Sequence, residues 1–238
     1  MATLITPGDL EMLSWLGRHR FVSAPQVARF SRRPQKVAYR RLAALRERQL
    51  VAYERPVLGN GCYWATKDGL ALAGIDLRPA RVDIRSLFHD RAVVDLALEL
   101  EACGQVLVTE REMRHADAEV QFAGVGRPRY GLRLPGGGEG GALHYPDLAV
   151  ELEEGRIRAV EMERLAKNRA RLERILTGYA RARRVVEVVY YVPGARVGGH
   201  VERIAAAVGA TPVVSVVVWP GWGHLREVNQ RAGANRHG

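Results

Sequence analysis

Residues 146–167 read PDLAVELEEGRIRAVEMERLAK, and they carry the strongest structural signal in the second half of the chain. Two runs typical of β-strands flank a turn at Glu154-Gly155, which predicts one strand over 145–151 and another over 157–163. The basic, amphipathic residues that follow predict a long helix over 165–183. Two neighbouring strands and a helix therefore converge within a few residues of one another.

Charged side chains stand at the ends of these predicted elements. Asp147 lies in the first strand, Glu161 and Glu163 end the second, and Lys167 follows on the helix. Glu161 and Glu163 share a face because side chains alternate along a strand. Carboxylates at the ends of adjacent strands bind a hard divalent cation, and a nearby lysine stabilises phosphoryl charge. The pattern predicts a metal site, and the alternative is an acidic, solvated hairpin followed by a salt-bridged helix.

The remaining second half predicts a mixed α/β domain with a central sheet. A helix is predicted over 90–103 and a strand over 105–109, and a loop rich in glycine, arginine and proline then continues to the strand at 145. The runs 185–192 and 213–219 are continuously apolar, as expected for strands covered on both faces.

The first half predicts three short helices and a hairpin. Thr6 and Ser23 are candidate helix caps, and Pro7 stands at a first helical position. A third helix is predicted from about 34 to 49, and a Gly59-Asn60-Gly61 turn joins two short β-rich runs. Three helices and a hairpin predict a winged helix-turn-helix. The expected domains are 1–76 for this module, 77–88 for a linker, 89–220 for the α/β domain and 221–238 for a polar tail.

Charge points to a polyanionic partner. The net charge is +10 and the isoelectric point is about 10.2, with arginines crowded into the first fifth of the chain and into 164–184. The third helix of a winged helix enters the major groove of DNA, and the hairpin contacts the backbone or the minor groove. The predicted DNA-binding residues are Arg32, Arg33, Gln35, Lys36, Tyr39, Arg40, Arg41 and Asn60. Packing of a basic winged helix against protein is the alternative, and for 164–184 the alternative is a membrane-surface helix.

Several classes of protein are not supported by the sequence. No apolar run reaches the roughly 18 residues of a membrane span, and the N-terminus lacks the pattern of a secretion signal. Cys62 and Cys103 are isolated and fit no disulfide or metal framework. A cytoplasmic protein without membrane association is therefore expected.

The order of the elements, with Pro146-Asp147 and Glu161-x-Glu163 in place, resembles the PD-(D/E)xK nuclease superfamily. Together with the N-terminal winged helix, the chain is similar to the replication-relaxation family of actinobacterial and firmicute plasmids and mobile elements. The resemblance also rests on Tyr63-Trp64-x-Thr66-x-x-Gly69, on His89 and on the block 144–192. The superfamily pattern places a lysine at position 163, where this chain has Glu163, so Lys167 must reach back to replace it.

This resemblance implies a bacterial protein that binds double-stranded DNA in the control of plasmid or mobile-element replication or transfer. Replication or relaxase proteins and a second copy of the chain are the candidate protein partners. If the second domain cleaves DNA, Mg²⁺ or Mn²⁺ is held by Asp147, Glu161 and Glu163, and Lys167 completes the catalytic set. The alternative is a non-enzymatic regulator whose nuclease-like domain serves dimerisation or partner docking.

Overall fold

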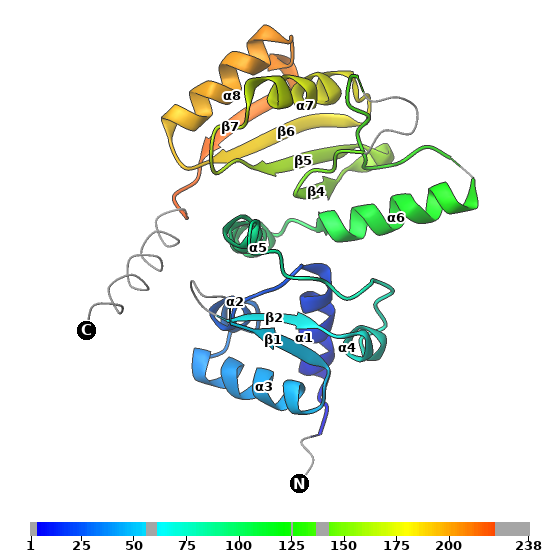
Figure 1. Ribbon diagram of the computed structural model, residues 1–238, viewed down its shortest axis with the longest axis vertical. Helices are drawn as coiled ribbons and strands as arrows, with labels where there is room; N and C mark the ends of the chain where they lie inside the picture. The colour runs from blue at the N-terminus through cyan, green and yellow to red at the C-terminus, as the bar shows by residue number, and fades with distance from the viewer. Residues whose placement is uncertain (1–3, 56–60, 125, 137–142, 222–238) are drawn as a thin grey trace. The chain divides into compact units, whose positions relative to one another are not determined.

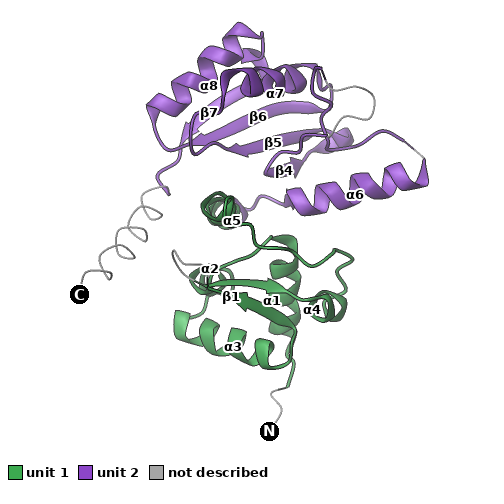
Figure 2. Cartoon of the chain, in the orientation of Figure 1, with its two compact units in different colours: residues 1–99, 223–238 green, residues 100–222 purple. Residues whose placement is uncertain are grey.

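The computed structural model describes residues 4–55, 61–124, 126–136 and 143–221. These residues form eight α-helices, a two-stranded sheet and a five-stranded sheet (Figure 1). The prediction of a mixed α/β chain with a central mixed sheet is confirmed. The chain divides into two compact units, unit 1 up to Glu99 and unit 2 from Leu100 (Figure 2).

Unit 1 begins with three helices and a hairpin. Its elements are α1 (Pro7–Arg18), α2 (Ala24–Phe30), α3 (Gln35–Glu47), β1 (Val51–Glu54), β2 (Cys62–Ala65) and α4 (Lys67–Leu72). The predicted caps are in place, because the backbone N–H groups of Thr6 and Ser23 donate to the side chains of Asp9 and Gln26 at 2.6 and 2.8 Å. β1 and β2 pair antiparallel, and Val22 forms a further antiparallel bridge with Tyr63.

The segment from Thr66 to Gly69 ties α4 to the hairpin. The Thr66 hydroxyl donates to the carbonyl oxygen of Gln49 at 2.7 Å and accepts the backbone N–H of Gly69 at 3.1 Å. A Cβ at position 69 would lie 2.1 Å from the carbonyl oxygen of Leu50. The glycine of the Tyr63–Gly69 motif is therefore required by this close backbone approach.

The helix α5 (Leu87–Ala102) contributes to the core of unit 1. Val94 and Leu98 pack against α1, α2 and the hairpin, and the Gln26 amide donates to the carbonyl oxygen of Arg91 at 2.9 Å. These contacts place the boundary between the units after Glu99, whereas the sequence placed the start of the second domain at residue 89. The predicted tail lies outside the described residues except for Gly221.

Unit 2 is a five-stranded sheet in the order β3-β4-β5-β6-β7. β4 runs antiparallel to both of its neighbours, β3 and β5, whereas β5, β6 and β7 are parallel. The strands and helices of unit 2 are β3 (Leu107–Thr109), α6 (Glu110–Ala123), β4 (Leu148–Glu151), β5 (Ile157–Met162), α7 (Arg169–Arg181), β6 (Val185–Val192), α8 (Ala195–Ala207) and β7 (Val214–Val218). Two short 3-10 turns lie at 153–155 and 211–213.

Helices α7 and α8 lie side by side against the parallel part of the sheet (Figure 1). Leu172, Ile175, Leu176 and Tyr179 of α7 are each at most 1% exposed and pack in the same core as Ala159, Val188 and Tyr190. This burial rules out the membrane-surface alternative for α7, because its apolar face is already covered by the sheet. In the described part of the chain no helix has the length and apolarity to cross a membrane.

Two local predictions were wrong. The loop expected after Thr109 begins with α6, whose start is fixed by a reciprocal cap in which the Thr109 N–H donates to Glu112 at 2.8 Å. The helix expected from residue 165 begins only at Arg169, because the Asn168 side chain caps it by accepting the N–H of Ala170 at 3.0 Å. Lys167 therefore lies in the connection before α7, not in its first turn.

Candidate functional site

Strand register brings Asp147 and Glu161 to neighbouring positions. Leu148 of β4 pairs with Val160 of β5 in an antiparallel ladder. The next pair outward along these two strands is therefore Asp147 and Glu161. The Asp147 carboxylate accepts the backbone N–H of Met162 at 2.7 Å, and Tyr190 of β6 pairs with Glu161 on its other side. Residues paired across a ladder project from the same face of the sheet, so these side chains share one face.

Glu161 is the centre of a buried polar network. Its side chain is only 2% exposed, and its Oε1 accepts the Tyr179 hydroxyl at 2.5 Å and lies 2.8 Å from Nε2 of His144. Burial alone would raise the pKa of Glu161, but His144, Lys167 and the Tyr179 hydrogen bond outweigh it and lower the pKa to about 2. Glu161 is therefore held as a carboxylate inside the fold.

Glu163 and Lys167 form the second part of this network. Nζ of Lys167 lies 2.5 Å from Oε2 of Glu163, although Lys167 precedes the helix. Burial raises the pKa of Glu163 in spite of the adjacent lysine. Burial also opposes the charge of Lys167, but Glu161, Glu163 and Asp147 outweigh it and raise the pKa of the lysine. Nε2 of His200 on α8 lies 3.2 Å from the carbonyl oxygen of Lys167 and helps to fix this connection.

The four residues predicted as catalytic thus lie in one region, but they are not arranged as a closed cation site. Among the described residues, Asp147, Glu161 and Glu163 do not bring one carboxylate oxygen each within 4.8 Å of one another. Each carboxylate is instead engaged by a protein group. Asp147 accepts a backbone N–H, Glu161 contacts a tyrosine and a histidine, and Glu163 pairs with a lysine. The donor set is the hard oxygen set that Mg²⁺ and Mn²⁺ prefer.

Two tyrosines of this region were not singled out from the sequence as polar groups. Tyr179 was expected as an apolar contact of α7, and its ring is buried as expected, but its hydroxyl donates to Glu161. Tyr190 is 0% exposed, and its hydroxyl has no hydrogen-bond partner among the described residues. The sequence signal for Tyr190 is a hydroxyl-bearing ring within a strand that is mostly valine, and Tyr179 stands on the apolar face of an amphipathic helix.

We expect the network around Glu161 to make stability depend on pH in the acid range. A carboxyl with a lowered pKa in the fold contributes stability that is present above its unfolded pKa and lost as pH falls. The difference in unfolding free energy between wild type and Glu161→Gln should be widest near pH 7. It should close as pH falls from about 4.5 towards about 2. Urea titrations at several pH values measure this difference, and a gap that does not change with pH would contradict the assignment.

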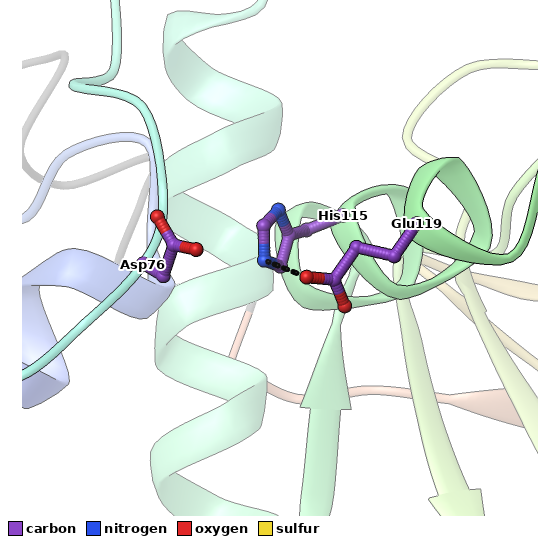
Figure 3. Close-up of side chains that lie close together, drawn as sticks. All are labelled: Asp76, His115 and Glu119. Carbon is purple, nitrogen blue, oxygen red and sulfur yellow. Dashed lines mark ion pairs between the residues drawn. The ribbon is translucent and has the colours of Figure 1, made fainter. Parts of the chain in front are cut away.

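A histidine–glutamate pair outside this network lies on α6. Nε2 of His115 is 3.5 Å from a carboxylate oxygen of Glu119, one helical turn further on (Figure 3). The side chains are 37% and 65% exposed. With the histidine protonated, an i,i+4 pair of this exposure stabilises a helix by about 0.3–0.5 kcal/mol.

The second candidate site is a cationic surface on unit 1. It consists of exposed side chains of α3 and of the turn before it and is named here the α3 surface: Arg32, Arg33, Gln35, Lys36, Tyr39 and Arg40. A cavity of about 610 Å³ borders it, between the start of α1 and α3. No carboxylate pairs with its four cations in the described part of the chain. The remaining face of α3 is buried through Ala38, Leu42 and Leu45.

Two predicted DNA-binding residues are not on this surface. The guanidinium of Arg41 is paired with Asp9 of α1, which is 1% exposed, and with the carbonyl oxygen of Leu4 at 2.8 Å. Arg41 therefore links α3 to α1. Burial raises the pKa of Asp9, but hydrogen bonds from Arg41 and Thr6 outweigh it and lower the pKa. Asn60 lies outside the described residues.

Comparison with known proteins identifies one relationship. A family model described as replication-relaxation matches residues 13–188, which run from α1 into β6 and include both candidate sites. The match covers well over half of the chain. A search of curated proteins found no match.

Proposed function

Because this chain belongs to the replication-relaxation family, we propose that it is a duplex-DNA-binding protein that controls replication or transfer of a plasmid or mobile element. Membership of the family supports a replication-related role. The observation that carries the DNA-binding proposal is the α3 surface. Its cations have no carboxylate partner among the described residues, whereas Arg29 and Arg41 of the same unit pair with Asp95 and Asp9.

The arrangement of unit 1 supports a winged helix-turn-helix. Helices α1, α2 and α3 are followed by the β1–β2 hairpin, and Val22, between α1 and α2, adds a third short extended segment to it. In this architecture α3 is the helix that enters the major groove. Lys36, Arg40 and the arginines of the preceding turn would neutralise phosphates, and Gln35 and Tyr39 would lie near base edges.

The test is the salt dependence of binding by the full chain. Replacing Arg32, Arg33, Lys36 and Arg40 together by glutamine should weaken duplex binding and reduce the slope of log affinity against log salt by up to about 3.6, at about 0.9 per phosphate contact. A matched control removes the same charge from arginines that already have acidic partners: Arg114, Arg129, Arg158 and Arg169. Equal slopes for the two variants would contradict the assignment of the α3 surface.

A second proposal assigns unit 2 to the PD-(D/E)xK-like domains that cleave DNA. The observation that favours it is the convergence of Asp147, Glu161 and the Lys167–Glu163 pair at the ends of adjacent strands. Asp147, Glu161 and Glu163 would hold Mg²⁺ or Mn²⁺, which when bound polarises a phosphate and lowers the pKa of a bound water. Lys167 would offset negative charge on the phosphate. Loading would require Glu161 to exchange its present contacts for the cation.

The existing contacts of the carboxylates favour the alternative, a non-enzymatic regulator. Glu161 and Glu163 already have protein partners, as in a domain that serves dimerisation or partner docking. Two measurements separate the nuclease from the regulator. One is calorimetric titration with Mn²⁺, and the other is conversion of supercoiled plasmid to nicked or linear form. Metal binding and cleavage, both lost in Asp147→Ala, would establish the nuclease. Duplex binding without either would establish the regulator.

A further inference from the structure

Helix α7 and the residues after it carry an excess of arginine on the outside of unit 2. The exposed residues Arg171, Arg174, Arg181, Arg183 and Arg184 are named here the α7 surface. The acidic residue of this helix, Glu173, is engaged by Arg169 at 2.7 Å. Glu187, on the following strand, is engaged by Arg158 at 2.6 Å and by the Ser215 hydroxyl at 3.1 Å.

The arginines of the α7 surface keep their charge uncompensated. Among the described residues, none of the five forms an ion pair, and Arg174 donates to the carbonyl oxygen of Pro135 at 2.9 Å, which is a neutral acceptor. The face of α7 opposite to them is fixed in the core through Leu172, Ile175 and Leu176. The packing of the helix therefore directs the guanidinium groups of Arg171, Arg174 and Arg181 outward, and Arg183 and Arg184 are exposed in the connection that follows.

The arginines of α7 extend over a length that covers several phosphates of a DNA strand. Arg174 and Arg181 lie seven residues apart on the same side of α7, so they are about 10 Å apart along the helix axis, and Arg171 and Arg181 are about 15 Å apart. Successive phosphates of one DNA strand advance along the duplex axis by about 3.4 Å each. Arginine binds phosphate oxygens through a planar, two-pronged fork of N–H groups.

The composition of the α7 surface argues against a protein partner. Interfaces between proteins have a centre of buried apolar and aromatic side chains. The exposed large hydrophobic residues of the described chain do not fall between Arg169 and Arg184, where the exposed residues are arginines and alanines. A surface of arginines without an apolar centre fits a uniform polyanion.

We propose that the α7 surface is a second DNA-binding surface, which contacts the phosphate backbone of the duplex without reading its sequence. This inference rests on the proposed function, because DNA is the partner in both. It differs in placing a contact on unit 2 that is independent of the carboxylate network and of cleavage.

The experiment replaces Arg171, Arg181, Arg183 and Arg184 by glutamine in the full chain and measures duplex affinity from about 50 to 200 mM salt. The control is the Arg114, Arg129, Arg158 and Arg169 variant, which loses the same charge from paired arginines. The slope of log affinity against log salt should fall by up to about 3.6 in the α7 variant, equally on two duplexes of unrelated sequence. Thermal unfolding of each variant checks that the fold is retained.

The outcomes distinguish the two proposals. A wild type that does not bind duplex DNA would overturn the proposed function and this inference together. A wild type that binds, with a slope that is the same in the α7 variant and in the control, would overturn this inference alone. A loss that occurs on one duplex sequence and not on the other would also overturn it, because backbone contacts carry no sequence information.

Discussion

Replacing Lys167 by methionine is expected to lower the free energy of unfolding by about 3 kcal/mol, within the 3–5 kcal/mol typical of breaking a buried ion pair. Nζ of the lysine lies 2.5 Å from Glu163, whose side chain is 4% exposed. Methionine fills a similar volume but leaves the Glu163 carboxylate buried without its counter-charge. Urea unfolding of the full chain at pH 7 measures the loss.

The double variant Lys167→Met with Glu163→Gln provides the control for this prediction. It removes both charges, so it should recover most of the stability that the single variant loses. Burial already raises the pKa of Glu163 in the wild type. A carboxyl with a raised pKa in the fold favours the folded state at low pH, so the single variant should regain stability on acidification. A loss below about 1 kcal/mol would mean that the pair behaves as a surface ion pair.

The second large effect is expected for Asp117→Ala, at about 3–5 kcal/mol. Asp117 of α6 is 0% exposed, and its carboxylate accepts three consecutive backbone N–H groups, those of Arg129, Tyr130 and Gly131, at 2.6, 3.1 and 2.7 Å. Alanine would remove the acceptor from all three donors, of which the Tyr130 N–H lies in a buried hydrogen bond and the other two lie in partly buried ones. Each unsatisfied donor costs about 1–3 kcal/mol, and partial relaxation of the segment reduces the sum.

Asp117→Asn is the matched variant, because it keeps one oxygen acceptor but places an NH₂ group against the remaining donors. Its loss should fall between those of the wild type and the alanine variant. Amide hydrogen exchange localises the effect, which should appear first at residues 129–131. Unchanged protection of these amides in Asp117→Ala would show that the carboxylate does not organise the segment.

The fold was predictable from the sequence where local signals agree with packing. Local residue patterns predicted several elements correctly: the caps at Thr6 and Ser23, the two strands around Gly155 and the aliphatic run of β6. Helix α6 was missed because few of its residues are apolar and buried, Met113 being the main one. The Thr109-x-x-Glu112 cap was the signal that could have identified it.

The candidate site was predictable only in part, for a physical reason. Strand alternation and register are short-range rules, so Asp147, Glu161 and Glu163 could be placed together. The partners of Glu161 are different, because His144 and Tyr179 come from a loop and a helix whose distance from β5 depends on the packed core. The pairing of Arg41 with Asp9 is also tertiary, and periodicity on α3 alone could not separate Arg41 from its exposed neighbours.

The contribution of α5 to unit 1 has a consequence for synthesis of the protein. A nascent chain that has emerged only as far as the hairpin and α4 still lacks Val94 and Leu98, which complete the core of unit 1. It also lacks Arg91, whose carbonyl oxygen accepts a hydrogen bond from the Gln26 amide. Unit 1 therefore completes its core only when residues of α5 have left the ribosome. Because chains grow at about 5–20 residues per second, the completed α3 surface would be displayed a second or more after its own residues have emerged.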